Sequence, residues 1–126
     1  MTAQLEENPK IAVIDDDAAV RNATKGLLRS LGFTVSTFAT AEEFLSCGDR
    51  RDMSCVITDV RMPGIGGIEL LRRLVTEQNA PPVIVMTSFP EERMQEHMLA
   101  AGARGFLTKP YREQRLIDCL KSAMAA

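Results

Sequence analysis

Residues 11–17 read IAVIDDD, a short apolar run that ends abruptly in three aspartates. A run of this length and β-branched content is typical of a strand that is buried on both faces. A helical pattern follows, and its apolar stripe consists of Val20, Leu27, Leu28 and Leu31. Gly32 comes next, at the position where a left-handed residue commonly ends a helix. The segment therefore predicts a strand followed by a helix.

The same alternation recurs along the rest of the chain. Five apolar runs, each followed by helical periodicity, are predicted as strands at residues 11–14, 33–35, 55–57, 83–86 and 105–107. Parallel strands joined by helices form a sheet that is covered on both faces through right-handed crossovers. We therefore predict a doubly wound α/β fold with a five-stranded parallel sheet. It is expected to form one domain, residues 10–126, after a polar tail at residues 1–9.

Local patterns also indicate where helices begin and which positions they bury. Thr40 with Glu43, and Ser88 with Glu91, have the spacing of a capping box and predict two helix starts. Apolar faces are expected in the third and last helices at Ile68, Leu71 and Val75, and at Leu116, Ile117, Leu120 and Met124.

The composition excludes several classes of protein. A hydrophobic content of 45% and a charged content of 25% are ordinary for a globular domain. Net charge is −2 and the basic residues are scattered, so we expect no direct nucleic-acid binding by this segment. The three cysteines form no CxxC pair, which argues against a zinc site. No basic-then-apolar leader or long apolar run is present, so we expect a cytoplasmic protein without a membrane segment.

Polar residues stand where most of the predicted strands end, which is the edge at which ligands bind in such sheets. They are Asp15, Asp16 and Asp17; Thr58 and Asp59; Thr87 and Ser88; and Thr108, Lys109 and Pro110. Acidic clusters that the fold brings together repel each other, and a divalent cation relieves that repulsion. Because the candidate ligands are all oxygens, Mg²⁺ is favoured, with Mn²⁺ as an alternative. A lysine and a threonine hydroxyl suit a transferring phosphoryl group, and a carboxylate can be its nucleophile.

The segments VIDDD (13–17), ITDVRMPGIGG (57–67), VMTS (85–88) and GFLTKP (105–110) occur in this order. Together they resemble the receiver domains of bacterial response regulators, over essentially the whole chain after Lys10. The wording VRMPGIGG is similar to the FixJ-type transcriptional regulators, in which a separate DNA-binding domain follows the receiver. Gly66 departs from the family pattern, which usually has aspartate there. The resemblance implies a flavodoxin-like sheet with strand order 2-1-3-4-5.

The resemblance also implies the roles of the acidic residues. Asp59 is expected to accept the phosphoryl group and to be a metal ligand. Asp16 is expected to bind Mg²⁺ directly and Asp15 through a water molecule. Arg61 would add its backbone carbonyl to the metal site.

Four further residues are assigned on the same basis. Lys109 is expected to pair with the phosphoryl oxygens, and the Lys109–Pro110 peptide bond is expected to be cis. Thr87 is expected to move its hydroxyl onto the phosphoryl group, and Phe106 occupies the aromatic switch position.

These roles describe a signalling domain rather than an enzyme. The phosphoryl donor would be a sensor histidine kinase or a phosphotransfer protein, and the domain would catalyse its own phosphorylation and slow dephosphorylation. It would then control an output domain, in a transcriptional regulator, or a protein partner. A phosphorylation-dependent homodimer is expected through the fourth helix, fifth strand and fifth helix, roughly Pro90 to Met124.

Two other classes use similar scaffolds. A phosphatase of the haloacid dehalogenase type forms an aspartyl phosphate but needs a second aspartate where this chain has Arg61. A flavin carrier needs an anion-binding loop after the first strand, where Asp15, Asp16 and Asp17 would repel the flavin phosphate.

Overall fold

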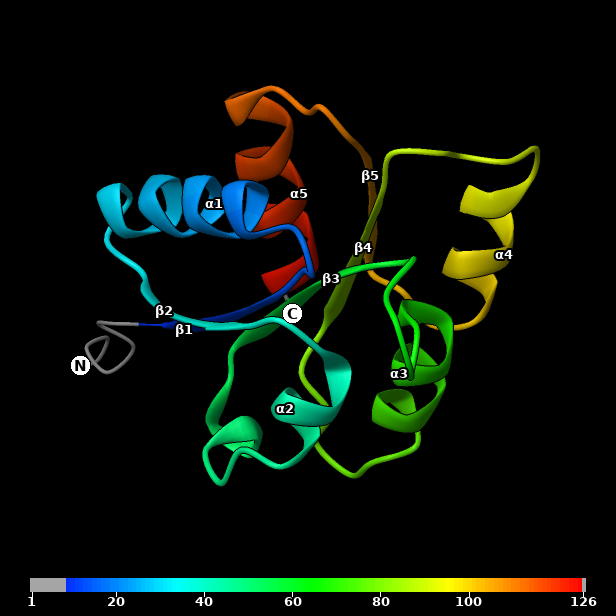
Figure 1. Ribbon diagram of the computed structural model, residues 1–126, viewed down its shortest axis with the longest axis horizontal. Helices are drawn as coiled ribbons and strands as arrows, with labels where there is room; N and C mark the ends of the chain where they lie inside the picture. Colours follow the sequence, from blue (N-terminus) through cyan, green and yellow to red (C-terminus); the bar gives the residue numbers. More distant parts are fainter. Residues whose placement is uncertain (1–8, 126) are drawn as a thin grey trace.

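The computed structural model describes residues 9–125 and contains a five-stranded parallel sheet (Figure 1). Its strand order is β2-β1-β3-β4-β5, so the predicted fold and strand order are confirmed. The expected tail at residues 1–9 lies, except for Pro9, outside the described residues, and that domain division stays a prediction. In the described part, no helix is both long and apolar enough to cross a membrane.

Strands and helices alternate along the chain. The strands are β1 (Lys10–Ile14), β2 (Thr34–Phe38), β3 (Cys55–Asp59), β4 (Val83–Thr87) and β5 (Gly105–Thr108). The helices are α1 (Ala18–Ser30), α2 (Ala41–Leu45), α3 (Gly67–Val75), α4 (Met94–Ala100) and α5 (Glu113–Met124), with a short 3-10 helix at Arg50–Asp52.

The helices form two layers, one on each face of the sheet (Figure 1). α1 and α5 cover one face, and their buried residues join alternate positions of the strands in one core. α2, α3 and α4 cover the other face and share a second core with the remaining strand positions. Because side chains alternate along a strand, each of these strands contributes to both cores.

The end of α1 agrees with the sequence prediction, and its start shows a cap that was not predicted. Asp17 is its N-cap, and the carboxylate accepts hydrogen bonds from the backbone N–H groups of Ala19 and Val20. Gly32 follows the helix with φ of +97°, a conformation that costs glycine little. Thr40 caps α2 as predicted, since its hydroxyl accepts a hydrogen bond from the Glu43 N–H. The return bond of the capping box differs, because the Glu43 carboxylate accepts from the Ala39 N–H and not from the Thr40 N–H.

The predicted start of α4 is wrong. The helix begins at Met94 instead of just after Ser88, and its N-cap Arg93 has a left-handed backbone with no side-chain capping bond. The physical reason is Pro90, because the residue before a proline avoids the helical conformation. Phe89 would have had to be helical if Ser88 were the cap.

The predicted apolar face of α3 is also partly wrong. Leu71 is buried, but Ile68 and Val75 are 36% and 41% exposed. The buried positions are Gly67, Leu70, Leu71 and Leu74, which recur at helical spacing. α3 therefore carries apolar residues on two faces, and the sequence pattern alone did not show which one faces the sheet. In α5, Leu116 and Leu120 are buried as predicted.

Candidate functional site

The acidic site forms where two adjacent strands end. β1 and β3 pair in parallel with Ile14 opposite Thr58, so the residues that follow, Asp15 and Asp59, are neighbours at the carboxyl edge. Asp15, Asp16 and Asp59 each offer a carboxylate oxygen, and these three oxygens lie within 4.8 Å of one another. The structure thus brings together the acidic residues that the sequence singled out.

Asp15 is fully buried, and each of its polar groups has a partner. Its Oδ1 accepts a hydrogen bond from the Asp17 N–H at 2.9 Å. Its backbone carbonyl accepts one from Arg21 Nη1, on α1, at 2.6 Å. Lys109 Nζ donates to the second carboxylate oxygen, Oδ2. A buried carboxylate is stable only with such compensation, so Asp15 has a fixed position.

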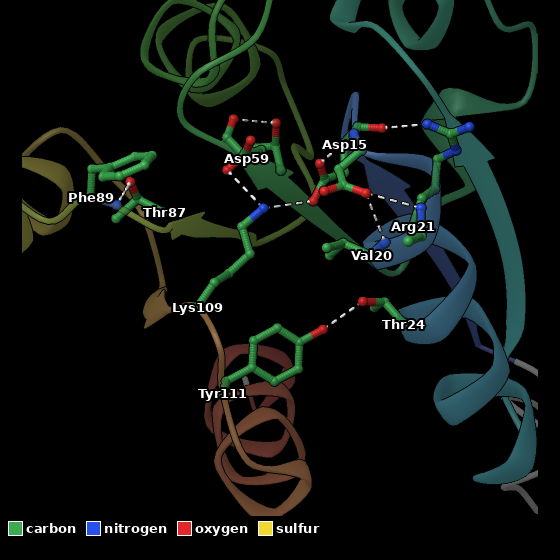
Figure 2. Close-up of polar contacts among 12 residues, drawn as sticks. Asp15, Val20, Arg21, Thr24, Asp59, Thr87, Phe89, Lys109 and Tyr111 are labelled. Carbon is green, nitrogen blue, oxygen red and sulfur yellow. Dashed lines mark hydrogen bonds and ion pairs between the residues drawn. The ribbon is translucent and has the colours of Figure 1, made fainter.

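Lys109 connects the two acidic strand ends (Figure 2). Its Nζ lies 3.0 Å from Asp15 Oδ2 and 3.4 Å from Asp59 Oδ1. The backbone N–H of Lys109 donates to the carbonyl of Thr87 at 2.8 Å, which continues the β4–β5 ladder by one bond. The Lys109–Pro110 peptide bond is cis.

The electrostatics of this group reflect its burial. Desolvation raises the pKa of Asp59 above its ordinary value; Lys109 opposes this shift and the Asp15 charge adds to it. Burial alone would lower the pKa of Lys109, but the hydrogen bond that Lys109 donates to Asp15 and the attraction of both carboxylates outweigh it and raise the pKa. The lysine therefore stays charged, and the acidic side of the site is not fully neutralised.

The donor set fits a hard divalent cation. Three carboxylates converge, and all of their donor atoms are oxygens, as Mg²⁺ prefers. Both Asp15 oxygens already accept hydrogen bonds, whereas Asp16 is exposed. This arrangement suits Asp16 and Asp59 as direct ligands and Asp15 as a ligand through water.

The rim of the site consists of the loops that follow β3 and β4. Arg61 and Phe89 line the same cleft as Asp59, Thr87 and Lys109. The Arg61 guanidinium lies over the Phe89 ring, with Cζ 5.5 Å from its centroid. Arg61 also forms an ion pair with Glu91 at 3.3 Å, between exposed side chains.

Thr87 and Phe106 lie on the strands behind this rim. Thr87 is buried, and its Oγ1 accepts a hydrogen bond from the Phe89 N–H at 3.1 Å. In the β4–β5 register, Val85 is opposite Phe106 and Thr87 is opposite Thr108. Phe106 is partly buried against the core beneath α4 and does not line the Asp59 cleft. The structure therefore places Thr87 in the site and Phe106 outside it.

Gly67 allows α3 to begin close to Asp59. A Cβ atom at this position would lie 2.3 Å from the Asp59 carbonyl oxygen and 2.9 Å from Val60 Cα. The N–H of Gly67 donates to the Val60 carbonyl at 2.9 Å. A side chain here would displace the backbone that carries Asp59.

Two contacts near the site were not predicted. One is the bond from Arg21 to the Asp15 carbonyl; the other is a hydrogen bond between the hydroxyls of Thr24 and Tyr111 (Figure 2). A signal for the second was present, because Thr24 is a polar residue four positions from both Val20 and Leu28 on the apolar stripe of α1. Its partner is too distant in sequence to be found that way.

Comparisons of the sequence and of the structure with known proteins all find response regulators. A family model described as the response regulator receiver domain matches residues 11–121. The transcriptional regulatory protein FixJ of Bradyrhizobium diazoefficiens is 41% identical over 114 residues, which are 90% of this chain and 56% of that protein. The chain thus spans little more than half of this relative.

Solved structures of receiver domains have the same fold as this chain. The crystal structure of FixJ-N superimposes with a TM-score of 0.81 at 30% identity, covering 93% of this chain and 94% of that one. A response regulator receiver protein from Burkholderia phymatum gives a TM-score of 0.80 at 40% identity, covering 93% of this chain and 95% of that one.

Proposed function

Since this chain belongs to the response regulator receiver domain family, in its FixJ-type subgroup, we propose that Asp59 accepts a phosphoryl group from a histidine kinase or a phosphotransfer protein. The domain catalyses this transfer itself and later hydrolyses the acyl phosphate slowly. The phosphatase and flavin-carrier alternatives have no support from the family match.

The observation that carries the proposal is the position of Lys109. Its ammonium reaches both Asp59 and Asp15 from a third strand, so a cation already stands beside the proposed nucleophile. A phosphoryl group on Asp59 would add negative charge at that point, and a fixed ammonium stabilises such charge as it develops. An ordinary surface ion pair would not be held between two buried carboxylates.

In the proposed reaction, an Asp59 carboxylate oxygen forms a bond to phosphorus as the P–N bond of the donor phosphohistidine breaks. The electron pair of that bond leaves with the imidazole nitrogen. Asp16, Asp59 and the Arg61 carbonyl would hold Mg²⁺ directly and Asp15 through water. The cation would offset the charge on the phosphoryl oxygens. Lys109 binds the same oxygens from the other side.

The output follows from Thr87. Its hydroxyl would leave the Phe89 N–H and bond to a phosphoryl oxygen, which moves the loop before α4. Phe106, on the same face of the sheet, can then repack beneath α4. We propose that the α4–β5–α5 surface reads out this change by forming a homodimer or binding a partner. A transcriptional output domain is proposed because the FixJ relative is longer than this chain.

Phosphorylation of three proteins tests the proposal: the wild type, Asp59→Asn and Asp49→Asn. Asp49 is an exposed aspartate with no side-chain capping bond, and it serves as the matched control. Each is incubated with a small phosphodonor, with and without Mg²⁺. Acid-stable, base-labile label should appear on the wild type and on Asp49→Asn, only with Mg²⁺, and not on Asp59→Asn. Undiminished label on Asp59→Asn would contradict the proposal.

A further inference from the structure

Lys109 has to hold its ammonium between two carboxylates although it stands on a long, flexible stem. A lysine side chain loses roughly 2 kcal/mol of rotamer entropy when it is fixed. Its precision therefore depends on how firmly the backbone around it is anchored. On the N-terminal side that anchor is the 2.8 Å bond from the Lys109 N–H to Thr87.

The C-terminal side has no comparable backbone anchor. Pro110 has no N–H group, and within the described residues neither Tyr111 nor Arg112 donates a backbone hydrogen bond. The next backbone bond of this loop closes the first turn of α5, from the Arg115 N–H to Arg112. Between Lys109 and α5, the fixed point is the side chain of Tyr111, which reaches Thr24 on α1.

The Thr24–Tyr111 contact is partly buried. Thr24 is 2% exposed and Tyr111 is partly buried against the core beneath α1 and α5. Thr24 and Tyr111 line a surface pocket together with the apolar residues Val20, Leu27 and Pro110. A buried hydroxyl that loses its partner remains unsatisfied, which makes such a bond costly to break.

The same face of α1 also contacts Asp15, which forms the ion pair with Lys109. Arg21 and Thr24 are three residues apart and so lie side by side on the helix. Arg21 fixes the carbonyl of Asp15, and Thr24 fixes the loop that carries Lys109 (Figure 2). One helix face therefore contacts both the strand end that carries the Asp15 carboxylate and the loop that carries the Lys109 ammonium, and these two groups meet at 3.0 Å.

We infer that Thr24 and Tyr111 are positioning residues, whose hydrogen bond holds Lys109 in place for phosphoryl transfer to Asp59. This inference rests on the proposed function. Neither residue touches the reacting atoms: both act through the backbone of the segment from Lys109 to Tyr111. Loss of the bond should slow the chemical step and leave the binding of the phosphodonor unchanged, because the donor contacts neither hydroxyl.

A double-mutant cycle tests the inference. Tyr111→Phe and Thr24→Val each remove one hydroxyl and keep the packing nearly unchanged. Each should lower kcat for a small phosphodonor by about threefold to tenfold, as expected for one hydrogen bond, with KM unchanged. The double variant should be no slower than the single ones, because both remove the same bond. Thr24→Ser, which keeps the hydroxyl, should restore the rate.

The matched control is Thr76→Val, which removes an exposed hydroxyl that bonds to the Arg73 carbonyl at the end of α3. Its rate should equal that of the wild type.

Tyr111 is the chain's one tyrosine and the chain has no tryptophan, so intrinsic fluorescence reports on the Thr24–Tyr111 contact directly. Thr24→Val should change the emission, and Thr76→Val should not. Unchanged emission in Thr24→Val would overturn the inference.

A second measurement separates a positioning role from a merely structural one. NMR relaxation of the Lys109 side-chain methylenes, at constant pH and without phosphodonor, should show greater mobility in Tyr111→Phe than in the wild type. Lower stability with unchanged kcat and unchanged Lys109 mobility would overturn the inference, as would rate losses that multiply in the double variant. If the wild type gives no Asp59-dependent label, the proposed function fails, and the Lys109 relaxation still decides whether Tyr111 positions the lysine.

Discussion

The two faces of the sheet differ in how firmly their helices are attached to the site. α1 and α5 are 13 and 12 residues long, and α1 contacts the site through Arg21 and Thr24. α4 is seven residues long and follows a left-handed Arg93. The loop before α4 contacts the site through the exposed ion pair between Arg61 and Glu91 and through the bond from the Phe89 N–H to Thr87. If the proposed output surface is correct, the α1 side holds the site and the α4 side responds to it.

The length of α4, compared with α1 and α5, gives this difference its physical basis. Short helices have little stability of their own and depend on the packing of a few side chains. α4 buries Met94 and Met98, whereas Leu99 is 43% exposed. Segments with few buried contacts are those that open or shift at the lowest free-energy cost. A signal that moves α4 can therefore leave the α1 side unchanged.

The largest expected effect is on stability. Leu116→Ala, in α5, should lower the free energy of unfolding by about 4 kcal/mol, and Met98→Ala, in α4, by about 2 kcal/mol, because a short helix can relax into the cavity. Both side chains are almost fully buried, so burial alone would predict similar costs. Urea unfolding measures the difference, with the exposed Leu99→Ala as control. Equal costs would break the comparison between the faces.

The next largest expected effect is a difference in amide hydrogen exchange between the two faces of the sheet. Protection of residues 94–100 is expected to be roughly 10-fold to 100-fold lower than protection of residues 18–30, because α4 can open locally. A phosphoryl mimic at Asp59, such as beryllofluoride with Mg²⁺, should change protection between Pro90 and Met124 and leave α1 unchanged. Exchange followed by mass spectrometry resolves these segments. An equal response in α1 would contradict a one-sided output.

A smaller effect is expected from surface charge on the α4–β5–α5 side. Arg115 is exposed, and reversing its charge in Arg115→Glu should weaken the proposed phosphorylation-dependent dimer by about tenfold. Arg104→Glu should act in the same direction, although it also loses a bond to the Ala123 carbonyl. Arg29→Glu makes the same change on α1 and is the control. Sedimentation with the mimic measures the dimer; no dimer in the wild type would refute this surface.

The smallest effect concerns the rim. Removing Arg61 and Phe89 together, as Arg61→Ala with Phe89→Ala, should shorten the lifetime of the phosphorylated state severalfold, because both side chains line the cleft around Asp59. Arg73→Ala breaks an exposed ion pair with Glu69 elsewhere and should have no effect. Loss of label over time gives the lifetime. An unchanged lifetime would mean that the rim does not shield the acyl phosphate.

The features of this molecule that could be predicted from the sequence are those that local patterns determine. The sheet and the convergence of Asp15, Asp59 and Lys109 follow from strand-end positions, because parallel strands bring their carboxyl ends to one edge. The end of α1 at Gly32 also follows from a single residue with a known backbone preference.

The features that were not predicted depend on contacts between residues distant in sequence or on competition between local signals. Thr24 and Tyr111 are 87 positions apart, and no spacing rule links them. At Ser88 a capping pattern competed with Pro90, and the proline excluded the helix. In α3 two apolar stripes were available, and only packing against the sheet decided between them.

Gly66 and Gly67 are adjacent and look alike in the sequence, but a library of random variants would treat them very differently. Position 67 should accept only glycine, because any Cβ would collide with the main chain at Asp59. Position 66 is the N-cap of α3, has φ of −83°, and makes no side-chain cap. Its nearest obstacle is the Val60 carbonyl at 3.2 Å. Aspartate is among the best capping residues, so selection for thermal survival should enrich it at position 66 and deplete every replacement at position 67.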